Sequence, residues 1–133
     1  MKNFRVIALR LFVVSFLVVN AFSICNAVPR VGSPENLFVL TSTTPTFHWE
    51  EVPGADLYAL YVSRYPYGTK NLVYKNKLLK NASFKLPDGS LVDGERYRWN
   101  VSTREKSQWK DSSEPFYFRV QLNGPKVRVT GGK

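Results

Sequence analysis

The sequence predicts an all-β fold, a seven-stranded β-sandwich that follows an N-terminal signal peptide. Three observations lead to this prediction. Beyond residue 27, apolar and polar residues alternate in short runs, which is the period of a half-buried strand. Gly, Pro, Asn and Asp divide these runs at a spacing of about 10 residues, as in sandwich domains. No long segment repeats apolar residues with the period of a helix.

Residues 1–27 have the three parts of a secretory signal. An apolar run, "LFVVSFLVVNAFSI", follows the basic residues and small residues end the segment at Ala27. The basic residues are Lys2, Arg5 and Arg10. An uncleaved membrane anchor is the weaker alternative, because the run is shorter than the roughly 20 residues of a spanning helix and Asn20 interrupts it. Lipid attachment at Cys25 is disfavoured, since Ile24 precedes it where a small residue is expected.

Cleavage would leave one domain, residues 28–121, and a flexible basic tail, residues 122–133. The signal holds the single cysteine, three of the 19 Lys and Arg residues and none of the 10 Asp and Glu residues. The mature chain therefore has no disulfide and a net charge of about +6, which favours anionic partners. Nucleic acid is not expected as a partner of an exported protein.

The seven strands are expected where the alternation is clearest, as in "PTFHWE", "LYALYVSR", "YRWNVST" and "PFYFRV". They span residues 37–41, 45–50, 57–64, 71–75, 82–86, 95–104 and 114–121. The segments between them, such as "VPGAD", "YPYGT", "LPDGS" and "VDGE", carry turn residues. Alternation assigns these side chains to the core: Phe47, Trp49, Tyr58, Leu60, Val62, Tyr97, Trp99, Val101, Thr103, Phe116, Phe118 and Val120.

Several short motifs occur in a characteristic order. Trp49 lies at the end of the second expected strand, and "VPGADLY" follows as the turn into the third. Leu91 precedes the core residue Tyr97 by six residues at the bend into the sixth strand. In this order the motifs resemble those of bacterial fibronectin type III domains, and the resemblance extends over residues 33–120.

Trp99 and the "SQW" at 107–109 agree with bacterial members of that family, whereas Asp93-Gly94 replaces a more usual Pro-Gly pair. The resemblance implies an immunoglobulin-like sandwich that acts as a spacer, adhesive or accessory module among extracellular domains. Some animal members carry an Arg-Gly-Asp integrin loop. That tripeptide does not occur in this sequence, so integrin binding is not expected.

His48, the single histidine, lies close in sequence to Glu50, Glu51 and Asp56. A metal site needs three or more converging ligands, and a catalytic histidine needs a nucleophile and an orienting partner. Alternation turns His48 to solvent, and no "GxSxG" or "HExxH" motif occurs. We therefore expect a non-enzymatic protein with no catalytic residue, metal or cofactor. A small hydrolase with paired carboxylates is the least favoured alternative.

In the fibronectin type III topology the third, sixth and seventh strands share one sheet, and its outer face is the candidate binding surface. It would present Tyr61, Arg96, Arg98, Asn100, Tyr117 and Arg119. Arginine and tyrosine are favoured in recognition surfaces, although such neighbours also stabilise exposed sheets without a ligand. Trp109, in the polar stretch "REKSQWKDSSE", is a further candidate. It is expected in a loop, where it either caps the open end of the sandwich or stands exposed.

Lysines crowd the fourth and fifth expected strands, at Lys70, Lys75, Lys77, Lys80 and Lys85. They either discourage aggregation between sheet edges or attract an anionic polymer. Glycosylation sequons at Asn81 and Asn100 matter only in a eukaryotic host.

The function expected is that of an exported binding or adhesion module, located outside the cell, in the periplasm or at the cell surface. Its partner would be an anionic polysaccharide or cell-wall polymer, or a protein. A passive spacer or a subunit of a cell-envelope assembly is the alternative.

Overall fold

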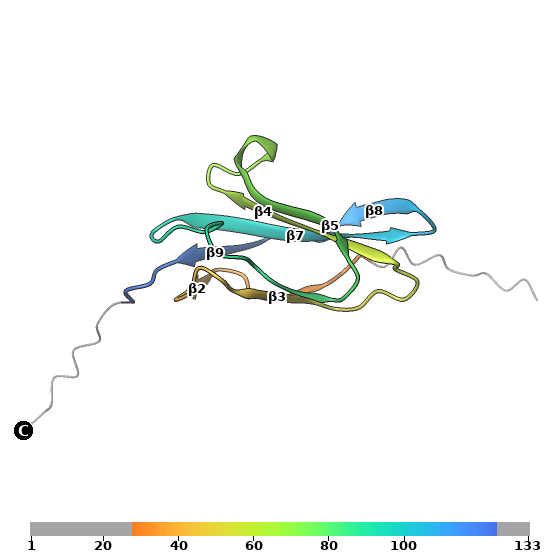
Figure 1. Ribbon diagram of the computed structural model, residues 1–133, viewed down its shortest axis with the longest axis horizontal. Helices are drawn as coiled ribbons and strands as arrows, with labels where there is room; N and C mark the ends of the chain where they lie inside the picture. The colour runs from red at the N-terminus through yellow and green to blue at the C-terminus, as the bar shows by residue number, and fades with distance from the viewer. Residues whose placement is uncertain (1–27, 125–133) are drawn as a thin grey trace, which may run out of the picture.

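The computed structural model describes residues 28–124 as two packed β-sheets (Figure 1). The expected signal peptide with Cys25, and the tail from residue 125 onward, lie outside the described residues. The small sheet has the order β1-β3-β6 and the large sheet the order β2-β9-β7-β4-β5, with β8 also paired to β7.

The strands are short except for β4, β5 and β7 of the large sheet. The small sheet consists of β1 (Val31–Ser33), β3 (Thr46–Trp49) and β6 (Ser83–Lys85). The large sheet consists of β2 (Phe38–Leu40), β4 (Leu57–Arg64), β5 (Leu72–Leu79), β7 (Arg96–Glu105), β8 (Gln108–Ser112) and β9 (Phe116–Val120). One 3-10 turn, η1 (Thr69–Asn71), precedes β5.

The all-β sandwich expected from the sequence is confirmed, but the described part of the chain has nine strands rather than seven. Each of the seven expected segments contains a strand. The strand expected at 71–75 continues to Leu79. The two additional strands are β1 and β8, which lie in segments without clear alternation.

The sequence did not predict strand β8, because the hairpin that joins it to β7 lacks the usual turn residues. Glu105 pairs directly with Gln108, so the loop has only two residues, Lys106 and Ser107. Both have positive φ, 47° and 66°. Two-residue hairpin loops of this geometry strongly favour Asn-Gly, because other residues are strained at positive φ. The sequence "KS" therefore gives no hairpin signal.

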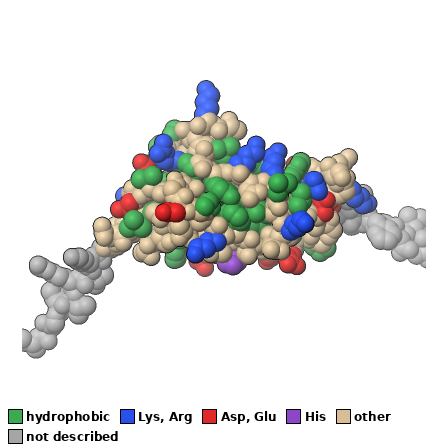
Figure 2. Space-filling model, in the orientation of Figure 1, with side chains coloured by type: hydrophobic (Ala, Val, Ile, Leu, Met, Phe, Trp, Pro, Cys, Tyr) green, Lys and Arg blue, Asp and Glu red, His purple; other side chains and the backbone are tan. Residues whose placement is uncertain are grey.

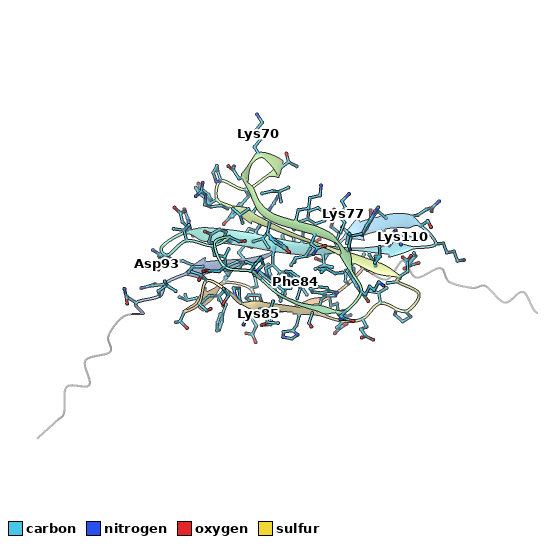
Figure 3. The ribbon with its side chains drawn as sticks, viewed as in Figure 1. Lys70, Lys77, Phe84, Lys85, Asp93 and Lys110 are labelled. Atoms are coloured by element: carbon cyan, nitrogen blue, oxygen red, sulfur yellow. The ribbon has the colours of Figure 1, made fainter. Side chains whose placement is uncertain are left out.

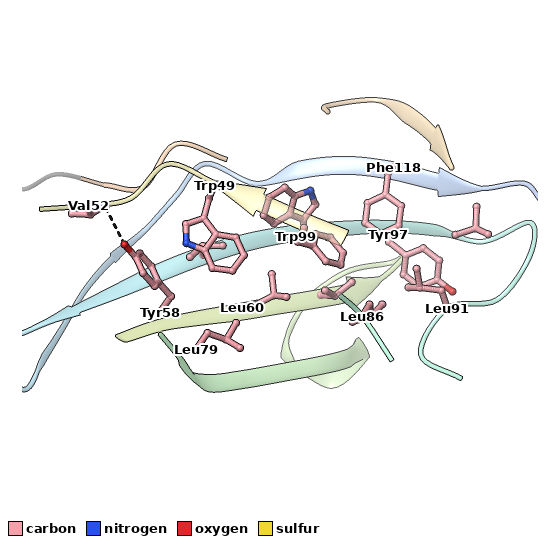
Figure 4. Close-up of a cluster of buried hydrophobic side chains, with 14 residues drawn as sticks. Trp49, Val52, Tyr58, Leu60, Leu79, Leu86, Leu91, Tyr97, Trp99 and Phe118 are labelled. Atoms are coloured by element: carbon pink, nitrogen blue, oxygen red, sulfur yellow. Dashed lines mark hydrogen bonds between the residues drawn. The ribbon is translucent and has the colours of Figure 1, made fainter. Parts of the chain in front are cut away.

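The core lies between the sheets and contains the side chains that alternation assigned to it (Figure 4). All are buried except Phe116, which is partly buried. Trp99 makes edge contacts with Phe47 at 4.9 Å and with Phe116 at 6.2 Å between ring centroids. Its indole N–H donates to the Pro34 carbonyl at 3.2 Å, which attaches the β1–β2 connection to the core.

Two tyrosine hydroxyls hold loops at opposite ends of the sandwich. The backbone N–H of Val52 donates to Tyr58 Oη at 3.0 Å, and that of Val92 donates to Tyr97 Oη at 2.8 Å. Figure 4 shows Tyr58 and Tyr97 at the two ends of the core. Burial raises the pKa of the Tyr97 phenol above its usual range, so the neutral form that accepts this bond is favoured.

We expect the double substitution Lys106→Asn/Ser107→Gly to stabilise the protein by about 1 kcal/mol, because it removes the strain of two residues at positive φ. This corresponds to a rise in melting temperature of about 4–8 °C for a domain of this size. As a control, Ser83→Gly in the extended strand β6 should lower the melting temperature. An unchanged or lower value for the double variant would contradict the proposed strain.

We expect Tyr58→Phe to destabilise the protein more than Tyr97→Phe, by about 1–3 kcal/mol against about 1 kcal/mol or less. The Val52 N–H is buried and would lose its partner, whereas Val92 is half-exposed and water can replace the lost hydroxyl. Urea unfolding of the two variants measures both changes. A larger loss of stability in Tyr97→Phe would contradict the expectation that the buried hydrogen bond contributes more than the half-exposed one.

Candidate binding surface

His48 lies on the outer face of the small sheet, as expected, opposite Ser33 and Ser83. His48 and Glu50 are both exposed. Among residues 28–124 no three His, Cys, Asp or Glu side chains converge as metal ligands would.

Strand pairing brings the expected surface residues together on the outer face of the large sheet. Tyr61 lies opposite Asn100, Arg98 opposite Tyr117, and Arg96 opposite Arg119. Residues directly opposite one another in a ladder point to the same face. We call this face, with the residues that surround it, the outer surface.

The expectation that Trp109 lies in a loop is wrong. Trp109 is in β8, directly opposite Arg104, and is 38% exposed. Because Arg104 shares the face of Arg96 and Arg98, Trp109 belongs to the outer surface and does not cap the end of the sandwich.

The Trp109 ring leans across the sheet toward β5. Lys77 Nζ lies 5.5 Å from its centroid, although three strand spacings of about 4.8 Å separate β8 from β5. Both side chains must therefore extend over β7 and β4. The two strands between them contribute Ala59 and Ser102, a cross-strand pair that is on the outer face yet is buried. In Figure 3, Lys77 lies near β8 on the side of the large sheet away from β3.

Two further tyrosines join the outer surface from the loop after β4. Arg96 lies over the Tyr65 ring at 4.3 Å, and Arg98 over the Tyr67 ring at 5.6 Å. Tyr67 makes edge contacts at 5.4 Å with both Tyr65 and Tyr117. Sequence reasoning assigned "YPYGT" only to a turn. The sequence feature that could have indicated these contacts is the pair Tyr65 and Tyr67, two aromatic residues that directly follow the end of an expected strand.

These contacts favour particular orientations of the cationic groups. Arg98 Nε also donates to Ser63 Oγ at 3.3 Å, and Lys75 Nζ lies 5.9 Å from the Tyr61 ring. Cation–π contacts of this kind contribute about 0.5–1 kcal/mol at exposed sites. In Figure 2, Lys and Arg side chains are interspersed with hydrophobic ones along the edge where β4, β5 and β8 lie.

Two hollows open on the outer surface. The first, of about 230 Å³, is lined by Leu37, Phe38, Tyr67, Arg96, Tyr117, Phe118 and Arg119. The second, of about 260 Å³, is lined by Tyr61, Ser63, Gly68, Thr69, Leu72, Lys75, Arg98, Asn100 and Ser112. The first is predominantly aromatic with two guanidinium groups, whereas the second is mostly polar.

One arginine of this face is already paired. Arg104 donates to both carboxylate oxygens of Asp56, at 3.1 and 2.7 Å. These bonds lower the pKa of Asp56 and raise that of Arg104. The pair is well exposed to solvent, so it orients Arg104 more than it stabilises the fold.

The five expected lysines separate in the structure. Lys75 and Lys77 contact aromatic rings of the outer surface, whereas Lys85 lies on β6 of the small sheet. Lys70 lies in η1, before β5, and Lys80 follows β5. Within residues 28–124 no helix is long and apolar enough to cross a membrane.

The described fold is similar to solved fibronectin type III domains. The chicken CNTN1 FN1-FN3 domains match with 19% identity and a TM-score of 0.54, over 68% of this chain and 29% of that chain. The fn3 domain of human contactin 1 matches with 16% identity and a TM-score of 0.53, over 80% of this chain and 93% of that domain.

An Fn3-like protein from Clostridium thermocellum matches with 14% identity and a TM-score of 0.52, over 71% of this chain and 95% of that protein. No protein-family model and no curated protein sequence matches the chain. At these identities the similarity establishes the architecture, which agrees with the resemblance in the motifs around Trp49 and Tyr97. The chain has the fibronectin type III fold.

Proposed function

We propose that the protein is an exported binding module that holds an anionic surface polymer on the outer surface of its large sheet. The observation that carries this proposal is the group of oriented cations on that face. Arg96, Arg98 and Lys75 each lie against a tyrosine ring, and Lys77 lies against Trp109. The fibronectin type III fold in general serves as a binding or structural module, which agrees with this role.

Charge complementarity supports an anionic partner. Pairing places Arg96, Arg98 and Arg119 on one face, and none of these three is in an ion pair within residues 28–124. A face of one charge attracts an oppositely charged polymer and binds it in a salt-dependent way. Cell-wall polymers and acidic polysaccharides have this charge, and an exported protein would meet them.

The module is proposed to be non-enzymatic. Similar folds are typically non-catalytic modules, and the hollows of the outer surface are lined by aromatic, basic and neutral polar side chains. Such side chains suit recognition by stacking and hydrogen bonding more than acid–base chemistry.

A structural role, as a spacer or a subunit of an envelope assembly, is the second candidate. The matched chicken structure contains several fibronectin type III domains in one chain, an arrangement that suits spacing. The edge strand β2 also exposes Phe38 and Val39, which a neighbouring domain or subunit could cover. Cross-linking in intact cells would recover one fixed partner if this role is the true one.

The test of the proposed function is the triple variant Arg96→Ser/Arg98→Ser/Arg119→Ser. We expect its retention on immobilised anionic polymer at low salt to fall about tenfold or more, because three charge contacts of the face are lost. The retention of the wild-type protein should itself fall as salt screens the charges.

The matched control is Arg30→Ser/Lys80→Ser/Lys85→Ser, which removes the same charge outside the outer surface. Arg30 directly precedes β1 of the small sheet, Lys85 is on β6 of that sheet, and Lys80 follows β5. It should retain most of the binding. Equal losses in the two triple variants would show that net charge, and not the outer surface, holds the polymer. Full retention of the first triple variant would make the proposed function wrong.

A further inference from the structure

In the first hollow two arginines face each other across neighbouring strands. Arg96 of β7 lies directly opposite Arg119 of β9. Like charges in directly opposite positions destabilise a sheet. Within residues 28–124 the one ion pair joins Arg104 to Asp56, so no carboxylate of this part of the chain neutralises Arg96 or Arg119. A bound anion between the two guanidinium groups would remove their repulsion.

The lining between these arginines is aromatic. Tyr67 and Tyr117 contribute aromatic side chains to it on the face of the two arginines, and their rings meet edge to face at 5.4 Å between centroids. The volume of about 230 Å³ is smaller than a typical pocket for a drug-sized ligand. The hollow therefore fits a single ring-sized group that has both an apolar face and a negative charge.

The orientation of Arg96 suits a planar oxyanion. Its guanidinium carbon lies 4.3 Å from the centroid of the Tyr65 ring, and this contact restricts the orientation of the side chain. The N–H groups of a guanidinium point outward along its edge, where they match the two oxygens of a carboxylate. Lysine carries the same charge but lacks this forked geometry.

Building on the proposed function, we infer that the first hollow is a subsite for a uronic acid residue of an acidic polysaccharide. The carboxylate binds between Arg96 and Arg119, and the sugar ring packs on Tyr117. A phosphate polymer provides the charge without a ring for the aromatic lining. A neutral glucan provides the ring without the charge.

Calorimetric titration of the full chain with three probes tests this assignment. The probes are an oligogalacturonate, a polyphosphate of matched charge and a neutral glucan oligosaccharide. The variant Arg96→Lys/Arg119→Lys keeps the charge and removes both forks. It should weaken oligogalacturonate binding about tenfold and change polyphosphate binding less than about twofold. Tyr117→Ser should weaken oligogalacturonate binding alone, and the neutral glucan should not bind.

The control variant is Lys80→Arg/Lys85→Arg, two charge-preserving exchanges outside the outer surface. It should bind all probes as the wild type does. Unchanged oligogalacturonate binding by Arg96→Lys/Arg119→Lys would overturn the uronate subsite. So would an equal loss of polyphosphate binding, because the site would then take any anion.

These outcomes are separable from failure of the proposed function. If the lysine variant binds normally and the serine triple variant does not, the charged face still holds a polymer and only the subsite is wrong. If the serine triple variant also binds every probe normally, both proposals are wrong.

A second measurement uses the repulsion itself. Arg119→Gln removes one of the two facing charges, so we expect it to raise the melting temperature of the free protein by about 1–4 °C. The same variant should lose the increase in melting temperature that oligogalacturonate gives the wild type. A variant that melts no higher than the wild type and keeps that increase would contradict the inference.

Discussion

The burial of Trp99 is the constraint on which both the fold and the outer surface depend. This fully buried ring packs against Phe47 of the small sheet and Phe116 of β9, and its N–H holds the Pro34 carbonyl. Because neighbours in a strand point to opposite faces, burying Trp99 forces Arg98 and Asn100 to the outside. The position of the candidate surface is thus a consequence of core packing. Its charge and aromatic content depend on which residues alternate with the buried ones along each strand.

The outer surface differs from an ordinary solvated sheet face in how its charges are held. Flexible side chains lose conformational entropy on binding a ligand, and aromatic contacts that already restrict them reduce this cost. Arg96 and Arg98 are restricted in this way by Tyr65 and Tyr67, which come from a loop and not from the sheet. The loop after β4 therefore connects the fold to its proposed recognition role.

Alternation was enough to predict the strands that pack against the core, since residues such as Trp49, Tyr58 and Tyr97 must be buried for the sandwich to form. It was not enough where local geometry is decided by tertiary contacts. The Lys106-Ser107 turn adopts positive φ without glycine, because the pairing of β7 with β8 imposes it. The contacts of Tyr65 and Tyr67 could not be predicted either, because they depend on how a loop folds back over the sheet.

The parallel pairing of β2 with β9 has a mechanical consequence. These strands lie near opposite ends of the sequence, and Phe38, Val39 and Leu40 pair in register with residues 118–120. The Leu37 N–H adds a bond to the Tyr117 carbonyl and the Gln121 N–H one to the Leu40 carbonyl. The described chain enters and leaves the sandwich at opposite sides (Figure 1). Tension along the chain would therefore load these bonds together in shear, and the domain would resist stretching better than if they opened one at a time.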